Sequence, residues 1–318
     1  MKILFISAGS KKYGGKVYEE MIKNVLAGNF EVENENFFSQ KDFLFKIFGA
    51  SKRKNIDLVV RNFDASLFLN PKPVKNVVIV HHIDYSFAPT LMKFVSFFFT
   101  PLILNNLRKV DAIVTVSKFW ENYFKEKGYK NTFLIYNAFN LDDFEFSPEE
   151  IEEFKKKHNL TGKPIIYLGN CQKAKGVVES YQALKKLDAH LVTSGGRQVK
   201  TPARNLEIPH REYLKLLKAS DIVLTMSKFK EGWCRVAHEA MLLKTPVIGS
   251  GKGGMRELLE GGKQIICEDF SLLRKKVEYL LNHLEVREKM GQDGYSFARN
   301  FTIEKFEKNW LELIKKLI

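Results

Sequence analysis

The stretch EGWCRVAHEAMLLKTPVIGSGKGGMRE, residues 231–257, places two glutamates eight positions apart around the start of an alanine-rich helical run. A short apolar strand and a Gly-Gly turn follow. The start of a helix offers unpaired amides and a positive dipole end, so the amides of 233–236 are placed to hold a phosphate. Glu231 then lies beside that phosphate, and Glu239, one to two turns into the helix, can accept hydrogen bonds from two ribose hydroxyls. The spacing predicts a site for a nucleoside diphosphate and its sugar, although either glutamate alone fits a solvated position flanking a surface helix better.

The length and composition of the chain indicate its number of domains and the kind of partner that it binds. A chain of 318 residues is longer than one hydrophobic core usually organises, so we expect two domains. Hydrophobic residues make up 45% of the sequence and charged residues 28%, which is typical of a globular protein. The formal net charge of +14 favours an anionic partner such as phosphate, nucleic acid or acidic lipid.

The cysteines and apolar segments indicate a cytoplasmic protein. Cys171, Cys234 and Cys267 are odd in number and widely spaced, which predicts neither disulfides nor a zinc site. The first residues, MKILFISAGS, are more typical of a buried strand than of a signal sequence. FVSFFFTPLIL at 94–104 is interrupted by Pro101 and is shorter than the ~20 residues of a membrane-spanning helix.

Apolar runs alternate with longer amphipathic ones, which predicts βα units and parallel sheets. The break between two sets of strands falls near 140–162, where SPEEIEEFKKKHNLTG opens with a helix-starting Ser-Pro-Glu-Glu. We therefore expect an α/β protein whose ligands bind at the carboxyl ends of the strands, in the crevice between the domains. The expected strands are KILFIS, DLVVR, NVVIVHH, DAIVTVS and TFLIYN in the first set, and PIIYLG, AHLVTSG, DIVLTMS and TPVIGS in the second.

The Glu-x7-Glu pair within residues 231–257 resembles the donor-site signature of the retaining glycosyltransferases of the GT-B fold, family 4. Further stretches resemble other parts of that family: ISAGSKKYGGKVYEEMIKNV, VVIVHH, VDAIVTVSKF, LIYNAFN, YLGNCQKAKGVVESYQAL and REKMGQDGYSFARNFTIEKF. The resemblance covers most of the chain. It implies two Rossmann-like domains facing a central cleft, with acceptor binding in 1–145, donor binding in 146–300, and a helix at about 301–318 packing back on the first domain.

The resemblance also implies roles for individual residues. Glu231 would contact the donor sugar and Glu239 the ribose, while Lys175, six residues after Gly169, would neutralise the diphosphate. Family members commonly carry arginine where this chain has Asn170, so Lys173 and Arg235 are candidate substitutes for the missing charge. The remaining donor-binding candidates are Gly14, Gly15, Gly232, Trp233, Cys234, Arg235 and Val236.

Two adjacent histidines follow the strand VVIV. The family places a catalytic histidine at this strand end, near the anomeric carbon, followed by a residue that is often acidic. That register favours His81, with His82 in the acidic position, but either is a candidate catalytic residue.

Motifs that are absent from the sequence limit the possible reaction chemistry. No Asp-x-Asp occurs, so a metal-held diphosphate has no obvious ligands and we expect neither a metal nor a cofactor besides the donor substrate. GSGKGG at 249–254 lacks the Ser or Thr of a phosphate loop, which favours a Gly-Gly turn that positions a helix or contacts the donor.

Two stretches of the sequence are candidates for a basic surface that contacts a membrane. Residues 37–55 interleave aromatic side chains with cations, as a membrane-surface element does, and 90–109 is an apolar stretch with basic flanks that fits a buried helix equally well. The cations of the first surface are Lys41, Lys46, Lys52, Arg53 and Lys54.

These patterns predict a metal-independent retaining glycosyltransferase that moves a sugar from a nucleotide sugar to a glycan or lipid-linked acceptor. We expect it in the cytoplasm, in peripheral contact with the inner face of an anionic membrane. A nucleotide-sugar epimerase of the same fold and a basic nucleic-acid-binding protein stay open as alternatives, although no nucleic-acid recognition motif is found.

Overall fold

The computed structural model describes residues 1–8, 14–37, 40–87 and 90–318, and these form two compact units. The first unit contains residues 1–138 together with 303–318, and the second contains 139–302. Each unit is built around a six-stranded sheet in which every described strand pair is parallel. The expected α/β class with two parallel sheets is therefore confirmed.

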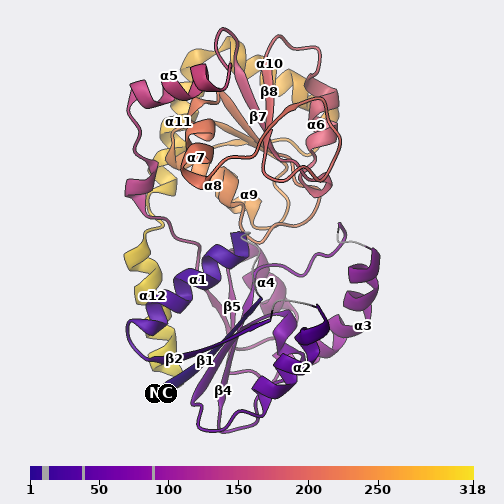
Figure 1. Cartoon of the computed structure of the whole chain (residues 1–318), viewed down its shortest axis with the longest axis vertical. Coiled ribbons are helices and arrows are strands. Elements are labelled where there is room, and N and C mark those ends of the chain that lie inside the picture. Colours follow the sequence, from indigo (N-terminus) through magenta and orange to yellow (C-terminus); the bar gives the residue numbers. More distant parts are fainter. Residues whose placement is uncertain (9–13, 38–39, 88–89) are drawn as a thin grey trace. The chain divides into compact units, whose positions relative to one another are not determined.

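The sheet of the first unit has the strand order β2-β1-β3-β4-β5-β6. Its strands are β1 (Lys2–Ala8), β2 (Glu31–Phe37), β3 (Leu58–Asn62), β4 (Lys75–Val80), β5 (Ala112–Thr115) and β6 (Thr132–Leu134). Its helices are α1 (Gly14–Ala27), α2 (Gln40–Ser51), η1 (Asp64–Leu67), α3 (Thr90–Leu107), α4 (Lys118–Glu126) and α12 (Ile303–Leu317). The last of these, α12, lies beside α1, as Figure 1 shows, so the end of the chain completes the first unit.

The sheet of the second unit has the order β12-β11-β10-β7-β8-β9, which is the Rossmann order when it is read from β7. Its strands are β7 (Ile165–Asn170), β8 (His190–Ser194), β9 (Arg204–Leu206), β10 (Ile222–Thr225), β11 (Val247–Gly249) and β12 (Ile265–Ile266). Its helices are η2 (Leu141–Phe144), α5 (Pro148–Lys157), η3 (Lys173–Lys175), α6 (Val177–Leu184), α7 (His210–Ala219), α8 (Arg235–Leu242), α9 (Met255–Gly261), η4 (Phe270–Leu272), α10 (Leu273–Asn282) and α11 (Leu284–Ala298). The direction in which the chain adds strands reverses between β7 and β10, and ligands of such sheets bind at this switch point.

All nine expected strands are present, and β2, β9 and β12 were not predicted. The strand β2 reads EVENENF and lacks the apolar run of a central strand, and in the described sheet it lies at the edge beside β1. One other detail differs from expectation, because helix α3 runs through Pro101 instead of being interrupted there. Helix α8 begins at Arg235 with Cys234 as its N-cap residue, which agrees with the helix start expected near Cys234.

The helix start predicted at Ser-Pro-Glu-Glu is confirmed. Ser147 is the N-cap residue of α5: its hydroxyl accepts a hydrogen bond from the Glu150 amide, and the Glu150 carboxylate accepts one from the Ser147 amide. This capping box supplies partners for amides that the helix itself cannot pair. No helix in the described part of the chain is both long enough and apolar enough to cross a membrane.

Candidate functional site

The candidate donor site lies at the switch point of the second sheet. Strand β7 ends at Gly169 and Asn170. Gly169 has a φ of +111°, a backbone conformation that residues other than glycine rarely adopt. Strand β10 ends next to it and leads into the loop that carries Glu231. The pocket between these strand ends is lined by Gly169, Asn170, Lys175, Leu224, Thr225, Ser227, Glu231, Cys234 and Val236.

A buried ion pair forms the centre of this pocket. Lys175 Nζ lies 2.6 Å from Glu231 Oε1, and the same oxygen accepts a short hydrogen bond from the Ser227 hydroxyl. The Lys175 side chain is 26% exposed and that of Glu231 is 8% exposed. Burial lowers the pKa of Lys175, but the Glu231 carboxylate outweighs this effect and leaves the pKa raised. The pocket therefore holds a lysine that stays charged at neutral pH.

The Gly-Gly turn of residues 253–254 holds the backbone of Glu231 in place. The Gly254 amide donates to the Glu231 carbonyl at 2.9 Å, and the Glu231 amide donates to Lys252 O at 3.2 Å. Gly253 has a φ of +69°, and a Cβ built there would lie 2.4 Å from the Glu231 carbonyl oxygen. The turn thus fixes the position of the pocket glutamate, which only a glycine at 253 allows.

Asn170, which stands where an arginine was expected, is part of a neutral network. Its Oδ1 accepts hydrogen bonds from the Tyr167 hydroxyl at 2.9 Å and from the Ser194 hydroxyl at 3.2 Å. Among the three candidate cations, only Lys175 lines the pocket. The Arg235 guanidinium instead lies over the Phe139 ring and 3.5 Å from Glu239, so it is engaged outside the pocket.

Glu239 is a second buried carboxylate, one turn into α8. Its Oε2 accepts a hydrogen bond from the Tyr213 hydroxyl at 3.3 Å, and its Oε1 lies 3.5 Å from Arg235 Nη2 and 3.9 Å from His210 Nε2. Burial lowers the pKa of Arg235, and the Glu239 carboxylate opposes that shift. The carboxylate is therefore held in place by side chains of α7 and α8.

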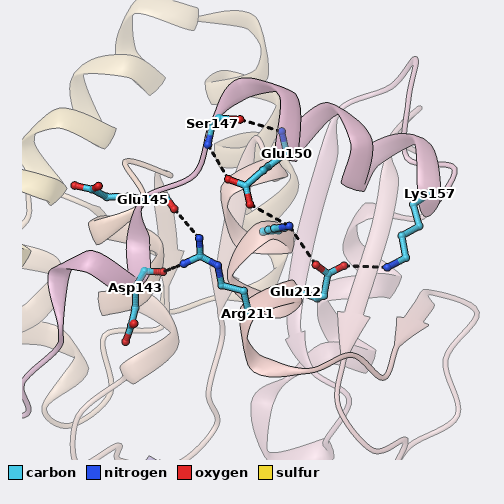
Figure 2. A network of polar contacts seen from close by, with 8 residues as sticks. Asp143, Glu145, Ser147, Glu150, Lys157, Arg211 and Glu212 are labelled. Atoms are coloured by element: carbon cyan, nitrogen blue, oxygen red, sulfur yellow. Dashed lines mark hydrogen bonds and ion pairs between the residues drawn. The ribbon is translucent and has the colours of Figure 1, made fainter.

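Helix α7, which carries His210 and Tyr213, is itself anchored to the chain segment before α5. Figure 2 shows Arg211 reaching the backbone oxygens of Asp143 and Glu145, each at 2.9 Å. Lys215 lies 3.3 Å from both Glu150 and Glu212, and Glu212 also pairs with Lys157 at 3.2 Å. These contacts fix the helix from which Tyr213 contacts Glu239.

The start of α8 only partly provides the predicted phosphate-binding amides. The Arg235 amide donates to the Trp233 carbonyl at 3.1 Å, so this amide is already bonded within the chain. The Trp233 side chain donates from Nε1 to His238 Nδ1 at 3.1 Å and is not among the pocket-lining residues. Burial raises the pKa of the Cys234 thiol, which lines the pocket, to about 12, so it stays protonated. Gly232 lies between Glu231 and Trp233 in the same loop.

Sequence reasoning missed His238, which is completely buried in α8. Because its Nδ1 accepts from Trp233, its Nε2 carries the hydrogen and donates to Ala298 O at 3.1 Å. Burial lowers the pKa of His238 to about 3, and the imidazole stacks on Phe139 at 4.1 Å. In the sequence, its position directly before Glu239 was the only sign that His238 lies near the site.

The two histidine candidates and the first Gly-Gly pair belong to the first unit. His81 and His82 follow β4 directly, and Gly14 and Gly15 open α1. The residues between β1 and Gly14, on which the predicted glycine loop partly falls, lie outside the described residues. Burial lowers the pKa of His81 to about 3, with a further contribution from His82, so its imidazole is neutral.

Two sheets of parallel strands in separate units, one with a Rossmann strand order and acidic and basic groups at its switch point, define the GT-B class of protein. HepE of Anabaena, solved in complex with UDP-glucose, has this fold: its TM-score with this chain is 0.80 at 17% identity, over 99% of this chain and 100% of that one.

Sequence comparison agrees with this fold. Residues 148–297 match the model of the glycosyl transferases group 1. An uncharacterized glycosyltransferase of Methanocaldococcus jannaschii is 24% identical over 314 residues, spanning 91% of this chain and 84% of the relative. The trehalose synthase of Pyrococcus horikoshii is 33% identical over 121 residues, which span 37% of this chain and only 29% of that protein.

Proposed function

We propose that this protein is a retaining glycosyltransferase that moves a sugar from a nucleoside diphosphate to a glycan or lipid-linked acceptor bound by its first unit. The observation that carries the proposal is the Lys175–Glu231 ion pair in the switch-point pocket, with buried Glu239 nearby on α8. The UDP-glucose bound in the related HepE structure supports a nucleotide sugar as the donor.

Each group has a role that its surroundings favour. The Lys175 ammonium neutralises charge on the departing diphosphate, because charge stabilisation in a site shielded from water is stronger than in solution. Glu231 accepts hydrogen bonds from the sugar hydroxyls, and Glu239 accepts them from the ribose. The bond from the anomeric carbon to the diphosphate oxygen breaks with its electron pair going to the diphosphate. The acceptor oxygen then bonds to that carbon and gives its proton to the departing diphosphate, and the configuration is retained.

Glu231 also controls Lys175 before the donor arrives. The ammonium is held 2.6 Å from the carboxylate, so a diphosphate competes with Glu231 for the same cation. Because the Ser227 hydroxyl already bonds to that oxygen, the glutamate keeps a partner when the lysine turns to the phosphate. Lys175 thus has an anionic partner both before and after the diphosphate binds.

A donor screen followed by product analysis tests this proposal. A donor present at ~100 times its dissociation constant should raise stability by ~2.7 kcal/mol, which a thermal-shift assay detects. The donor identified should then lose its sugar to an acceptor with the anomeric configuration retained, as NMR of the product shows. Conversion of donor alone to an epimer would instead assign the protein as an epimerase. Salt-dependent binding to random DNA without any nucleotide-sugar binding would reject both enzyme assignments.

We further propose that the first unit contacts an anionic membrane surface. Phe45 on α2 is 82% exposed and Phe97 on α3 is 74% exposed. Large exposed apolar side chains are typical of interaction sites. Of the predicted cations, Arg53 is paired with Glu33 and Glu35 at 3.1 and 2.7 Å. The exposed aromatic side chains therefore support membrane contact more strongly than the charge does.

Sedimentation with liposomes tests the membrane contact. We expect pelleting with vesicles that contain anionic lipid, and a Phe45→Ser, Phe97→Ser double variant should lose most of it. The matched control is Leu272→Ser with Leu284→Ser, which removes exposed apolar side chains from the second unit (51% and 55% exposed). Equal pelleting of the two double variants, or none of the unmodified protein on any vesicle, would reject this contact.

A further inference from the structure

The first unit contains a buried acid–imidazole pair that the donor site does not use. Glu19 lies on α1 and is 2% exposed, and His81 directly follows β4. Glu19 Oε1 is 4.0 Å from His81 Nε2. Glu19 Oε2 and His81 Nε2 are both buried without a hydrogen-bond partner. Unpaired buried polar atoms are costly, so two of them in neighbouring side chains indicate a bond that is completed during function.

The surrounding side chains fix the imidazole and leave one ring nitrogen for a ligand. Tyr18 meets the His81 ring edge-on at 5.2 Å, and its own hydroxyl donates to Ile135 O at 2.8 Å, which holds the tyrosine in place. The His81 side chain keeps 21% of its surface exposed, although its Nε2 is buried. A ligand therefore meets the ring through its Nδ1 edge, while Nε2 faces Glu19.

We propose that Glu19 is a positioning residue that sets the tautomer of His81, and thereby decides whether the exposed Nδ1 accepts or donates a hydrogen bond. An ionised Glu19 accepts a hydrogen bond from Nε2–H, and the neutral ring then presents the Nδ1 lone pair to a hydroxyl donor. A protonated Glu19 donates to Nε2, so the ring hydrogen is on Nδ1. The carboxyl gains one proton in the second state, and the ring keeps a single hydrogen throughout. Both states require the 4.0 Å gap between the two side chains to close to hydrogen-bond length.

The ionisation equilibria of the two groups agree with this arrangement. Burial raises the pKa of Glu19 to about 7, although Lys16 and an Asn62 hydrogen bond oppose the shift. Burial lowers the pKa of His81 to about 3, so Glu19 is the member of the pair that titrates near neutral pH. The other charged or titratable groups that act on the pair are Lys16 and Glu20 on α1, Asp64 after β3, and His82 after β4.

The ligand of this nitrogen follows from the proposed function, on which this part of the inference rests. An acceptor substrate offers a hydroxyl, which donates a hydrogen bond most effectively to a lone pair held in place. Ionised Glu19 therefore favours productive acceptor binding, and protonated Glu19 opposes it. The acceptor kcat/KM should rise about tenfold between pH 6 and pH 8, following the ionised fraction of Glu19.

The tautomer is measured directly by ¹⁵N NMR of the histidine-labelled, unliganded protein, with a His81→Asn variant to assign the signals. We expect His81 to change from Nδ1–H to Nε2–H with a midpoint near pH 7. Glu19→Gln should abolish the change between pH 5.5 and 8.5, and Glu19→Asp should keep a pH-dependent change. Glu20→Gln is the matched control, because this neighbouring carboxylate is half-exposed and pairs with Lys16; it should leave the midpoint within about half a unit.

A His81 tautomer that does not change with pH in the unmodified protein would overturn the proposal, even if Glu19→Gln fails to fold. A transition that persists in folded Glu19→Gln would also overturn it. Because this measurement uses no donor or acceptor, its failure leaves the proposed transferase activity intact. Conversely, an absence of sugar transfer would remove the acceptor hydroxyl from the argument but not the control of the tautomer.

Discussion

Replacing Lys175 by methionine tests whether the pocket contains a functional ion pair, because it removes one partner and leaves the other buried. Glu231 would lose the cation that lies 2.6 Å from its carboxylate, while its own side chain is only 8% exposed. Breaking a buried pair by removing one partner typically costs ~3–5 kcal/mol. Since the Lys175 side chain is a quarter exposed, water screens part of the charge and we expect about 3 kcal/mol, at the lower end of this range.

This loss should appear as a lower melting temperature of the second unit. A unit of this size loses about 2–4 °C for each kcal/mol, so Lys175→Met should melt about 6–12 °C lower at pH 7.5. The double variant Lys175→Met, Glu231→Gln has no buried charge in the pair and should recover most of the loss. Differential scanning calorimetry of the unmodified protein, Lys175→Met, Glu231→Gln and the double variant measures the coupling between the two residues. Unchanged stability of Lys175→Met at pH 7.5, or a double variant less stable than both single variants, would refute the reasoning.

Two further predictions concern other residues of the second unit, and a third concerns the need for a metal ion. His238→Leu removes the hydrogen bonds that His238 makes with Trp233 Nε1 and Ala298 O, and it should cost about 3 kcal/mol in urea unfolding. The folded-state pKa of His238 is about 3, so its contribution to stability should be complete above the unfolded pKa of 6.5 and should fall as the pH drops toward 3. A difference in the free energy of unfolding between the unmodified protein and His238→Leu that does not change with pH would contradict this. Tyr213→Phe removes the donor to Glu239 and should weaken nucleotide binding about fivefold by calorimetry, and unchanged affinity would show that the hydroxyl has no part in the site. Turnover should persist in EDTA, and its complete loss there would establish a metal requirement.

Much of the fold could be predicted from the sequence because central parallel strands are buried on both faces and appear as apolar runs. β4 and β10 are of this kind. The strand β2 was not predicted because its glutamates and asparagines form an edge strand whose charges pair elsewhere, for example with Lys2 and Arg53. The strands β9 and β12 are three and two residues long, which is too short for a periodic pattern.

The sequence likewise predicted some residues of the candidate site and not others. Glu231 and Lys175 could be identified because their motif fixes their place at two strand ends, and the structure brings them into contact. Ser227 and Tyr213 were missed because their roles depend on side chains that only the folded chain brings together. Glu19 could not be recognised either, since an acidic residue on a helix indicates a solvated position until its burial is known.

The central claim is that a nucleoside diphosphate binds in the second unit with its ribose on Glu239, and isothermal titration calorimetry tests it most directly. A panel of nucleoside diphosphates should contain at least one that binds the unmodified protein. Glu239→Ala should weaken that binding by about 5–150-fold, which corresponds to ~1–3 kcal/mol for the lost hydrogen bonds. The control Glu260→Ala, which removes an exposed carboxylate from α9, should bind with unchanged affinity. Equal affinity of Glu239→Ala and the unmodified protein, or no binding by any nucleoside diphosphate, would contradict the claim.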